Sequence, residues 1–366
     1  FKQSWIFPAF ALFRRGNYTY GMKINLGKTI EYLFYGIVFL LPWQAVWLWR
    51  EPFVGGFKWE YGTVGVYLVD ILVVLFLVLS LVEYRRAFNF QFKIFNFQTI
   101  SNVLISKFKK DTFYQLLVTS YGLLLLSLLS ILWSPDKILA LYFSFKLLLA
   151  VGLFWAARRI NFDWNKLIFI LLVTGALQGA LGIGQFLGQE TFSSKWLGMS
   201  QHISSEGGAS VVENASGRWL RAYGTFPHPN ILGGYLAIIC LMVLWKSSGK
   251  ISGWKFSGYA LIFSGIILSF SRSAWLVFAL GFVGMFLVQK QRRKELAKVA
   301  FIFASVLAIW ISAFSPLFFS RLEGQARLEQ KSLDDRQEYV MQAKEIISEN
   351  FWLGVGAGNY TVEVHK

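Results

Sequence analysis

Cysteine and histidine are scarce in this chain of 366 residues, with one cysteine and three histidines. The single Cys240 lies in an apolar run, which excludes an intramolecular disulfide framework and a cysteine metal site. The histidines stand far apart, at His202, His228 and His365. The sequence therefore indicates no metal centre, and we expect no metal or other cofactor.

Motifs that bind nucleotide phosphates are also lacking. The sequence has no P-loop, no GxGxxG that opens a helix and no HExxH. ATP-driven and nicotinamide-dependent chemistry therefore have no support in the sequence.

Charged residues are few, and most of them are basic. They make up 15% of the chain, against 55% hydrophobic and 18% aromatic residues, which is typical of a protein whose solvent is a lipid bilayer. Lysine and arginine number 36 and aspartate and glutamate 20, for a net charge of +16. In a soluble protein this excess would suggest a nucleic-acid partner, so its distribution along the chain decides its meaning.

Apolar stretches of a length that can cross a bilayer recur along the chain. We identify nine of them, of which the seventh and eighth are short. Their approximate ranges are 30–49, 63–82, 113–132, 138–157, 167–188, 226–245, 257–271, 274–289 and 299–317. The pattern predicts an all-α, polytopic integral membrane protein.

The basic residues indicate how the chain is oriented in the membrane. With the N-terminus in the cytoplasm, the inside loops hold 22 lysines and arginines and the longer outside segments hold 13. The positive charge is then mainly a topology signal, and nucleic acid is not an expected partner. The predicted parts are a cytoplasmic segment 1–29, a membrane domain 30–317 and an extracytoplasmic region 318–366 that is incomplete at its C-terminal end.

Two outside segments are longer than simple connections require. Residues 189–225 are polar and rich in serine and glycine, and residues 318–366 contain apolar positions at helical spacing. Ser332 and Asp335 resemble a capping box with aspartate in place of the usual glutamate. We therefore expect an amphipathic helix that begins near Ser332 and stops before the glycine-rich turn 354–358.

Arg336 belongs to the apolar stripe of this helix, three and four residues before Tyr339 and Val340. A cation on a buried helix face requires a partner. Two interpretations stay open: an acid such as Glu323 pairs with Arg336, or Arg336 faces an anionic ligand.

An unusual element leads into the sixth apolar stretch. Residues 221–235 read Arg-Ala-Tyr-Gly-Thr-Phe-Pro-His-Pro-Asn-Ile-Leu-Gly-Gly-Tyr, and the two prolines suit a helix start, where missing N–H donors cost nothing. The N-terminus of that helix then presents free N–H groups and a partial positive charge to the outside. With Arg221, His228 and Asn230 beside it, this helix start is a candidate anion site.

Two more cations are placed where they need an explanation. Arg272 stands in a Ser-Arg-Ser sequence between the two short stretches, at the tip of a predicted tight hairpin, where it binds a ligand or snorkels to lipid phosphate. Lys146 lies well inside the fourth stretch, where snorkelling explains it less well. It either pairs with Asp70 of the second stretch or binds a ligand phosphate.

Other polar residues have plainer interpretations. Gln178 and Gln185 stand seven residues apart on one face of the fifth stretch, where hydrogen bonding between helices is favoured. We expect His202 to be a solvated loop residue. His365 follows the glycine-rich turn and is a candidate general base near neutral pH.

These features together predict a cationic cavity on the outer face with few acids nearby. Clustered arginines suit a diphosphate, which guanidinium groups bind in a bidentate manner. No Asp-x-Asp pair lies near the site in sequence to hold a metal-bound sugar nucleotide. The expected ligand is a lipid-linked diphosphate held by cations alone.

Five sequence elements cover about residues 129–360. They are Leu-Ser-Ile-Leu-Trp-Ser-Pro-Asp at 129–136, Gln-Gly-Ala-Leu-Gly-Ile-Gly-Gln-Phe-Leu at 178–187, the element at 221–236, Leu-Ser-Phe-Ser-Arg-Ser-Ala-Trp-Leu at 268–276, and Asp335-Arg336 with Phe-Trp-Leu-Gly-Val-Gly-Ala-Gly-Asn-Tyr at 351–360. In these elements and their order, the chain resembles the O-antigen ligase and polymerase family (Wzy-C type) of bacterial envelope glycosyltransferases.

The resemblance implies a GT-C-like helical bundle with a large extracytoplasmic loop, in the bacterial inner membrane. Such enzymes move a glycan from a polyprenyl diphosphate, such as undecaprenyl diphosphate, to an acceptor hydroxyl on the periplasmic face without a metal. The expected partners are therefore a polyprenyl-diphosphate-linked glycan, an acceptor glycolipid, glycan or protein hydroxyl, and membrane lipids.

The resemblance also implies roles for individual residues. Arg221, Arg272 and Arg336 match family arginines that hold the donor diphosphate. We add three further candidate donor contacts, which are Lys146, His228 and Asn230. A histidine of the external loop activates the acceptor in the family, and it is either His365 or a residue beyond the end of this chain.

Several functions fit this description. Within the family, transfer to lipid A-core by a ligase, polymerisation of repeat units and transfer to protein stay open, because acceptor choice depends on variable loops. A flippase or transporter of lipid-linked glycans would show internal repeats and interrupted helices, which this sequence lacks. A scaffold protein would give no common explanation for the four candidate cations, which are Lys146, Arg221, Arg272 and Arg336. We expect a metal-independent, O-antigen ligase-like transferase.

Overall fold

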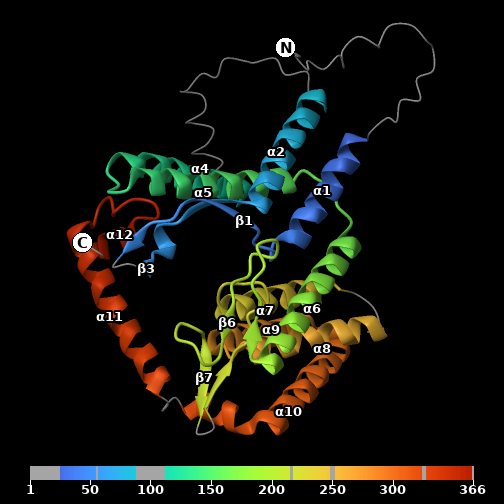
Figure 1. The fold of residues 1–366 in the computed structure, drawn as a ribbon. Coiled ribbons are helices and arrows are strands. Elements are labelled where there is room, and N and C mark those ends of the chain that lie inside the picture. The colour runs from blue at the N-terminus through green and yellow to red at the C-terminus, as the bar shows by residue number, and fades with distance from the viewer. Residues whose placement is uncertain are drawn as a thin grey trace, which may run out of the picture.

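The computed structural model describes residues 25–54, 57–87, 112–214, 217–247, 252–323 and 327–364. His365, the candidate base, and most of the predicted segment 1–29 lie outside the described residues. The described chain is mainly helical, as predicted, and its helices form two layers (Figure 1).

Four helices form the first layer, at the top of Figure 1. They are α1 (Leu26–Leu40), α2 (Leu68–Ala87), α4 (Thr112–Leu129) and α5 (Lys137–Ala157). Helix α2 packs against both α1 and α5, and α5 packs against α4. The core between α1, α2 and α5 is formed by Ile30, Ile37, Val73, Phe76 and Leu149.

Five helices form the second layer and the larger core. They are α6 (Trp164–Gly188), α7 (Pro229–Lys246), α8 (Gly253–Leu268), α9 (Arg272–Val288) and α10 (Arg293–Glu323). Helices α6 and α8 approach each other closely, because a Cβ atom on Gly179 would lie 2.2 Å from the carbonyl oxygen of Leu261. Helix α1 contacts α6 and joins the two layers.

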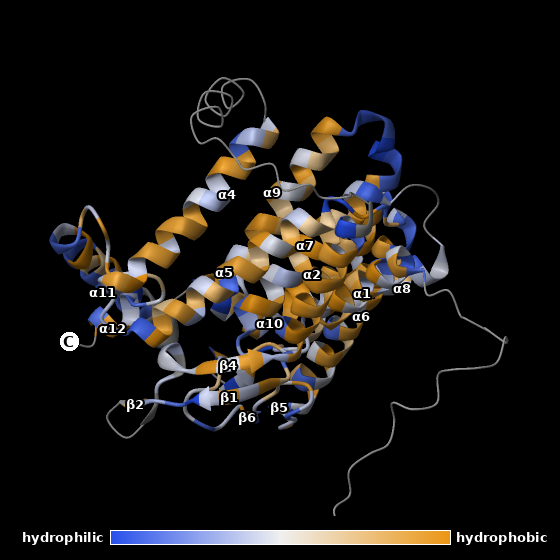
Figure 2. Ribbon diagram, turned by 90° about the horizontal axis from the view of Figure 1, so that it is seen from above, coloured by the Kyte–Doolittle hydropathy of each residue, from blue (hydrophilic) through white to orange (hydrophobic). Residues whose placement is uncertain are grey.

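Each of the nine predicted stretches overlaps one of these helices. Five helical segments are long and apolar enough to cross a membrane, by length and composition, within the ranges that the structure describes. They are Thr112–Leu132, Lys137–Ala157, Trp164–Gly188, Pro229–Lys246 and Lys290–Glu323. Helices α8 and α9 are shorter apolar helices, as predicted, and apolar residues cover the helices of both layers (Figure 2). The chain is a multi-pass membrane protein.

The first two predicted stretches are each wrong in part. Helix α1 ends at Leu40, just before Pro42, and the chain then forms β1 (Val46–Arg50) instead of more helix. Strand β1 pairs antiparallel with β4 (Val64–Tyr67), so α2 begins only at Leu68. Proline cannot continue a helix, and the valines and aromatic residues that follow favour a strand.

Short hairpins also occur elsewhere in the loops. Strand β2 (Phe53–Val54) pairs with β3 (Phe57–Lys58), β5 (Glu190–Thr191) with β6 (His202–Ile203), and β7 (Val211–Asn214) with β8 (Gly217–Leu220), all antiparallel. The long polar segment 189–225 is therefore built from two hairpins, which lie beside the second layer (Figure 1).

The chain ends in two helices outside the layers, α11 (Arg327–Glu349) and α12 (Tyr360–Val364). Helix α11 starts five residues before Ser332, so the predicted capping box is wrong. The residues that precede Ser332 include arginine, leucine, glutamate, glutamine and lysine, which all favour a helix. The helix ends before the glycine-rich turn, as predicted, and it spans from α10 to the first layer (Figure 1).

Candidate functional site

Two buried arginines bind the turn between α8 and α9. Arg221 Nε donates to the carbonyl oxygen of Ser269 at 2.8 Å, and Arg321 Nε donates to that of Phe270 at 3.0 Å. Their exposed fractions are 5% and 8%. Phe270 has a φ of 46°, a left-handed conformation that is uncommon for a bulky residue and marks a strained turn.

Helix α10 brings Arg321 to this turn because it is kinked. Phe314 has non-helical backbone angles, and Pro316 follows inside the helix, where it removes a backbone hydrogen bond and clashes with the preceding turn. The chain beyond the kink carries Leu317 and Phe318 into the main core and places Arg321 against the α8–α9 turn.

Two more arginines lie close to these. Arg272, the first residue of α9, is half-buried, and its charge acts on both Arg221 and Arg321. Arg336 of α11 also acts electrostatically on Arg321. We call Arg221, Arg272, Arg321 and Arg336 the arginine cluster. It combines three predicted site residues with Arg321, which the sequence interpretation missed.

The prediction that Arg336 lies on a buried helix face is wrong. Arg336 is exposed, as are Tyr339 and Val340 of the same stripe, because α11 stands apart from the helix layers. Glu323, the acid suggested as its partner, is also exposed, and no ion pair joins the two within the described ranges. Arg336 is thus an exposed member of the cluster.

Arg221 has no acidic partner among the described residues. Its second contact is neutral, from a terminal nitrogen to Asn230 Oδ1 at 2.5 Å. Burial, followed by the charge of Arg321, lowers the pKa of Arg221 from 12.5 to about 9. Tyr223 raises this pKa, and Arg272 lowers it by the smallest amount. Because an anion within the cluster would favour the charged guanidinium again, the cluster favours anion binding.

His228 caps α7 and is neutral near pH 7. Its Nδ1 accepts from the backbone N–H of Asn230 at 3.1 Å, and its Nε2 lies 3.0 Å from Ser210 Oγ. Burial, the charge of Arg221 and that of His202 lower the pKa of His228 from 6.5 to about 4. The ring is therefore poorly suited to act as a general base.

Two buried glutamines of α6 position the loop that contains Arg221. Gln185 Oε1 accepts from the backbone N–H groups of Tyr223 and Gly224, at 3.0 and 2.8 Å, and its Nε2 donates to the carbonyl of Gly224 at 2.7 Å. Gln178 Oε1 accepts from the backbone N–H of Thr225 at 2.9 Å. The glutamines therefore hold a loop rather than another helix, contrary to the interpretation that was favoured.

Gly224 is required at this point of the loop. Its φ is +61°, and a Cβ atom on it would lie 2.5 Å from Gln178 Oε1. The neighbouring Thr225 Oγ1 donates to the carbonyl of Pro42 at 2.6 Å, which ties the loop to the end of α1. The Gly-Thr-Phe element thus has a structural reason for each of its first two residues.

Lys146 forms an ion pair with Asp70. Its Nζ also lies 4.4 Å from the centre of the Tyr67 ring. Of the two interpretations that the sequence left open, the structure contains the first, the pair between α5 and the start of α2.

His202 is not a solvated loop residue, as had been expected. It belongs to β6, is partly buried and stacks on the ring of Tyr223, with 4.5 Å between the ring centres. This stacking depends on a hairpin that the sequence did not predict, so residue spacing contained no signal for it. In the part of the chain that the structure describes, no three His, Cys, Asp or Glu side chains gather into a group that could hold a metal ion.

The glycine-rich turn docks on the first layer. Asn359 is fully buried, and its amide binds both the N–H and the carbonyl of Asp136, at 2.8 and 3.2 Å. Ala357 N donates to Ser130 Oγ at 3.0 Å. Asp136 is further held by Arg50, whose guanidinium lies 2.6 Å from its carboxylate. Helix α11 is therefore anchored beyond its C-terminal end.

With this geometry in view, comparison with known proteins gives one match. Residues 257–365 match the model of the O-antigen ligase family (Wzy_C). Over this part, the chain is similar to the O-antigen ligase family. No match was found among curated proteins or among solved structures.

The O-antigen ligase match runs from α8 to the end of the described chain and includes Arg272, Arg321 and Arg336. The match suggests a membrane glycosyltransferase of the ligase or polymerase type, and proteins of that family act on lipid-linked glycans. Arg221 comes before the matched region and joins the cluster through space.

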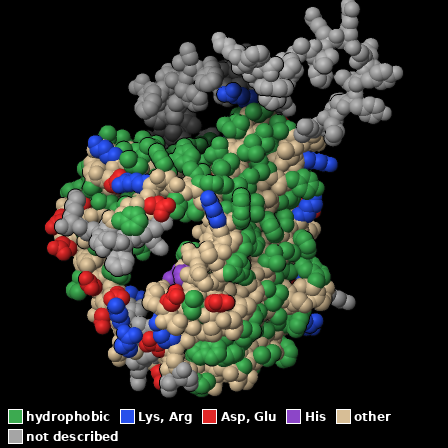
Figure 3. Space-filling view, in the orientation of Figure 1, with side chains coloured by type: hydrophobic (Ala, Val, Ile, Leu, Met, Phe, Trp, Pro, Cys, Tyr) green, Lys and Arg blue, Asp and Glu red, His purple; other side chains and the backbone are tan. Residues whose placement is uncertain are grey.

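The five sequence elements of the O-antigen ligase resemblance meet in two places. The elements at 178–187, 221–236 and 268–276 meet where Gln185 binds the Gly224 loop and Arg221 binds Ser269. Those at 129–136 and 351–360 meet at the Asn359 contact. The face drawn in Figure 3 is hollowed between the layers, and a histidine side chain reaches the edge of the hollow.

Proposed function

We propose that this protein is a membrane glycosyltransferase that moves a glycan from a polyprenyl-diphosphate donor to an acceptor hydroxyl on the periplasmic face of the bacterial inner membrane, as an O-antigen ligase does. The observation that carries the proposal is the arginine cluster. Four guanidinium groups from α9, α10, α11 and the loop before α7 interact there, and Arg221 has no acidic partner among the described residues.

The cluster divides into two pairs by exposure. Arg221 and Arg321 are buried, and each uses its Nε atom to bind a carbonyl of the α8–α9 turn, so their positions are fixed. Arg272 is half-buried and Arg336 exposed, so these two are the accessible cations. We assign Arg272 and Arg336 to direct contact with the donor diphosphate. We assign the buried Arg221 and Arg321 to the positive charge of the site and to the positioning of the α8–α9 turn.

The reaction is a displacement at the anomeric carbon. The acceptor oxygen forms a bond to this carbon, the bond from the carbon to the diphosphate oxygen breaks, and the electron pair leaves with the diphosphate. Cations that are already in place stabilise the negative charge that develops on the leaving group. The buried pair meets this condition because the turn holds both side chains before any substrate binds.

The proton of the acceptor hydroxyl passes to a histidine, for which His365 is our candidate. His228 is unsuited to this role, because its pKa is about 4 and both ring nitrogens already have partners. We leave Lys146 out of the donor site, because Asp70 neutralises it.

The test is an assay of the full-length gene product in membrane vesicles with a labelled polyprenyl-diphosphate glycan. We expect a new glycosidic bond and release of polyprenyl diphosphate, and we expect Arg272→Gln to reduce both about 100-fold. Arg218→Gln is the matched control, because Arg218 binds the carbonyls of Ser205 and Glu206 and not those of the α8–α9 turn.

Each product has a distinct meaning in this assay. Transfer to an added acceptor glycolipid supports the ligase activity, and joining of two donor glycans would assign polymerase activity instead. Movement of intact lipid-linked glycan across the bilayer, without a new glycosidic bond, would overturn the transferase proposal in favour of transport.

A further inference from the structure

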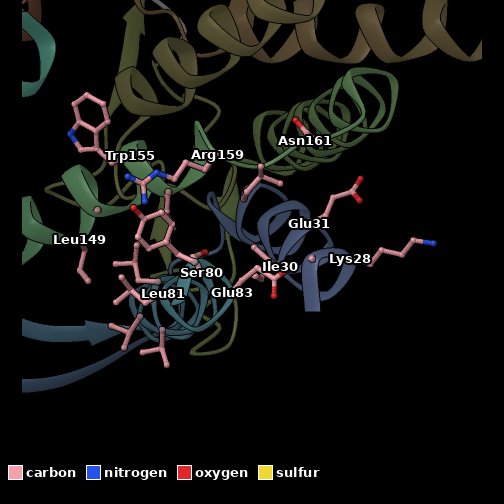
Figure 4. Close-up of a pocket in the computed structure, with 18 of the residues that line it drawn as sticks. Lys28, Ile30, Glu31, Ser80, Leu81, Glu83, Leu149, Trp155, Arg159 and Asn161 are labelled. Atoms are coloured by element: carbon pink, nitrogen blue, oxygen red, sulfur yellow. The ribbon is translucent and has the colours of Figure 1, made fainter. Parts of the chain in front are cut away.

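A cavity of about 1130 Å³ lies in the first layer (Figure 4). Its walls come from the N-terminal part of α1, the C-terminal parts of α2 and α5, and the connection to α6. The loop that carries Arg221 contacts the other end of α1, through Thr225 and Pro42. The cavity and the arginine cluster therefore lie at opposite ends of the helices.

The lining changes character along the helices. Toward the middle of α2 and α5 it is apolar, with Leu77, Val78, Leu148 and Leu149. At the helix ends it is polar and charged, with Lys28, Glu31, Ser80, Glu83, Tyr84 and Arg159. In a membrane protein this is the pattern of a lipid site, with apolar walls at the depth of the acyl chains and polar groups at the depth of the headgroup.

The charges at the polar end are balanced, and three of them, on Lys28, Glu83 and Arg159, have no ion pair among the described residues. The side chain of Lys28 points away from those of Arg159 and Glu83 (Figure 4). The guanidinium of Arg159 lies 4.7 Å from the centre of the Tyr84 ring and has no acidic partner among the described residues. The carboxylate of Glu83 has no basic partner in the same ranges. Glu31 differs, because it accepts from Tyr35 at 2.8 Å and lies 4.0 Å from Lys166.

One hydroxyl of the lining also lacks a partner. The hydroxyl oxygen of Ser80 is buried and makes no hydrogen bond within the described part of the chain. A buried hydroxyl without a partner is unfavourable, and Ser80 lines this cavity. Arg159 and Glu83, which have no ion pair, and Ser80, whose hydroxyl is buried without a hydrogen bond, thus line one apolar cavity.

We propose that this cavity binds a zwitterionic phospholipid with a primary ammonium headgroup. Arg159 binds the phosphate, and Glu83 accepts from the ammonium group. The acyl chains lie along α2 and α5.

Charge selects this occupant over an anionic lipid. A headgroup with a net negative charge would leave Glu83 facing a like charge, whereas an ethanolamine headgroup pairs with both Arg159 and Glu83. The cavity volume exceeds the range of about 300 to 1,000 Å³ that is usual for compact ligands, and it accommodates a headgroup with part of its chains. The site is separate from the arginine cluster, so it does not depend on the proposed transfer reaction.

Lipid retention tests the proposal. The full-length protein is reconstituted with equal amounts of phosphatidylethanolamine and phosphatidylglycerol, extracted in mild detergent and examined by native mass spectrometry. We expect preferential retention of phosphatidylethanolamine. Arg159→Gln should reduce retention of both lipids about tenfold. Glu83→Gln should reduce retention of phosphatidylethanolamine by a similar factor, so that the preference for this lipid is lost.

Arg158→Gln is the matched control. Arg158 is the neighbouring residue, but its guanidinium lies over the rings of Phe113, Phe154 and Trp155 rather than in the cavity lining. We expect this variant to retain both lipids as the wild type does. Equal retention of the two lipids by the wild type, or equal losses from Arg158→Gln and Arg159→Gln, would overturn the proposal.

A measurement on the unaltered protein guards against variants that fail to fold. A phosphatidylethanolamine with a photoreactive acyl chain should cross-link to peptides that contain Leu77 or Leu149. Excess phosphatidylethanolamine should compete for this cross-link more strongly than phosphatidylglycerol. Cross-links spread over the lipid-facing helices, or equal competition by both lipids, would overturn the proposed site.

Discussion

Asn359 binds the backbone of Asp136 through both ends of its side-chain amide, although 223 residues separate them. Asp136 caps α5 through a hydrogen bond to the N–H of Leu139, so Asn359 is joined to the start of that helix. Helix α11, with Arg336, therefore lies between this contact and the end of α10. The position of Arg336 depends on a turn that lies more than twenty residues away along the chain.

Gly356→Ala should release this turn. Gly356 has a φ of +92°, and a Cβ atom there would lie 1.8 Å from Ser134 Oγ. Gly354 has a φ of +62° but an open surrounding, so Gly354→Ala carries only the backbone strain of about 1 to 2 kcal/mol. Limited proteolysis should cut the Gly356→Ala variant near residues 350–360 faster than either the wild type or Gly354→Ala. Equal cutting of the two variants would contradict the docking.

Arg221→Lys should abolish most of the transfer activity while the protein stays folded. A lysine keeps the charge but cannot bind Ser269 O and Asn230 Oδ1 together, as the guanidinium does. We expect the turnover of lipid-linked glycan to fall about 100-fold. Arg218→Lys, in the preceding strand, should change turnover less than about twofold. Similar losses of turnover in both variants would show that transfer is sensitive to any change in this loop and does not depend on the arginine cluster.

The sequence predicted the helices because a membrane span is set mainly by the length of an apolar run. It failed between Val46 and Tyr67, where the same apolar residues form a hairpin. Hydropathy does not distinguish a strand rich in valine and tryptophan from a helix. Pro42 was the available signal for the end of α1.

The candidate site was predictable in its charges but not in its contacts. Arg221 and Arg272 were recognised as cations at helix starts, a local property. Arg321 stands near the end of an apolar stretch, and its role depends on the kink at Phe314, which brings α10 against a turn about fifty residues earlier in the chain. Which carbonyl an arginine binds is a tertiary property that spacing does not contain.

Removal of the loop contacts of Gln185 should cost more stability than removal of those of Gln178. Gln185→Leu leaves three backbone groups of Tyr223 and Gly224 buried and unpaired, whereas Gln178→Leu affects only Thr225. We expect losses of about 2 to 4 kcal/mol and about 1 to 2 kcal/mol. Thermal unfolding in detergent measures both variants under the same conditions. The reverse order would show that Gln185 does not hold the loop.

Acid should destabilise the protein through His228. The folded-state pKa is about 4, below the ordinary 6.5, so the unfolded chain binds the proton more tightly. The stabilisation is complete above pH 6.5 and is lost as the pH falls toward 4. We expect a loss of about 1 to 2 kcal/mol, reduced from the full linkage value because the ring is partly exposed.

His228→Asn is the control for this pH dependence. Asparagine can cap α7 but does not titrate, so the thermal midpoint of this variant should fall less between pH 6.5 and 4 than that of the wild type. Parallel curves for the two proteins would place the acid sensitivity elsewhere.

The pair of Lys146 and Asp70 allows its structural role to be separated from a role in donor binding. Lys146→Met leaves the carboxylate of Asp70 without its cation, and we expect a loss of stability of about 1 to 3 kcal/mol, since both side chains are only partly exposed. The double variant Asp70→Asn with Lys146→Met removes the unpaired charge. In this variant, the amide oxygen that replaces the carboxylate at position 70 can still accept from the N–H of Tyr67, as the carboxylate of Asp70 does at 2.8 Å. Stability should therefore return.

Glycan transfer by the same double variant decides the role of the pair. If Lys146 only pairs with Asp70, transfer returns with stability, because no group that contacts the donor has been lost. If Lys146 binds the donor diphosphate, stability returns but transfer stays low, since the missing cation is then part of the site. We expect recovery of both, because the structure already supplies Lys146 with a carboxylate partner and a ring beside it.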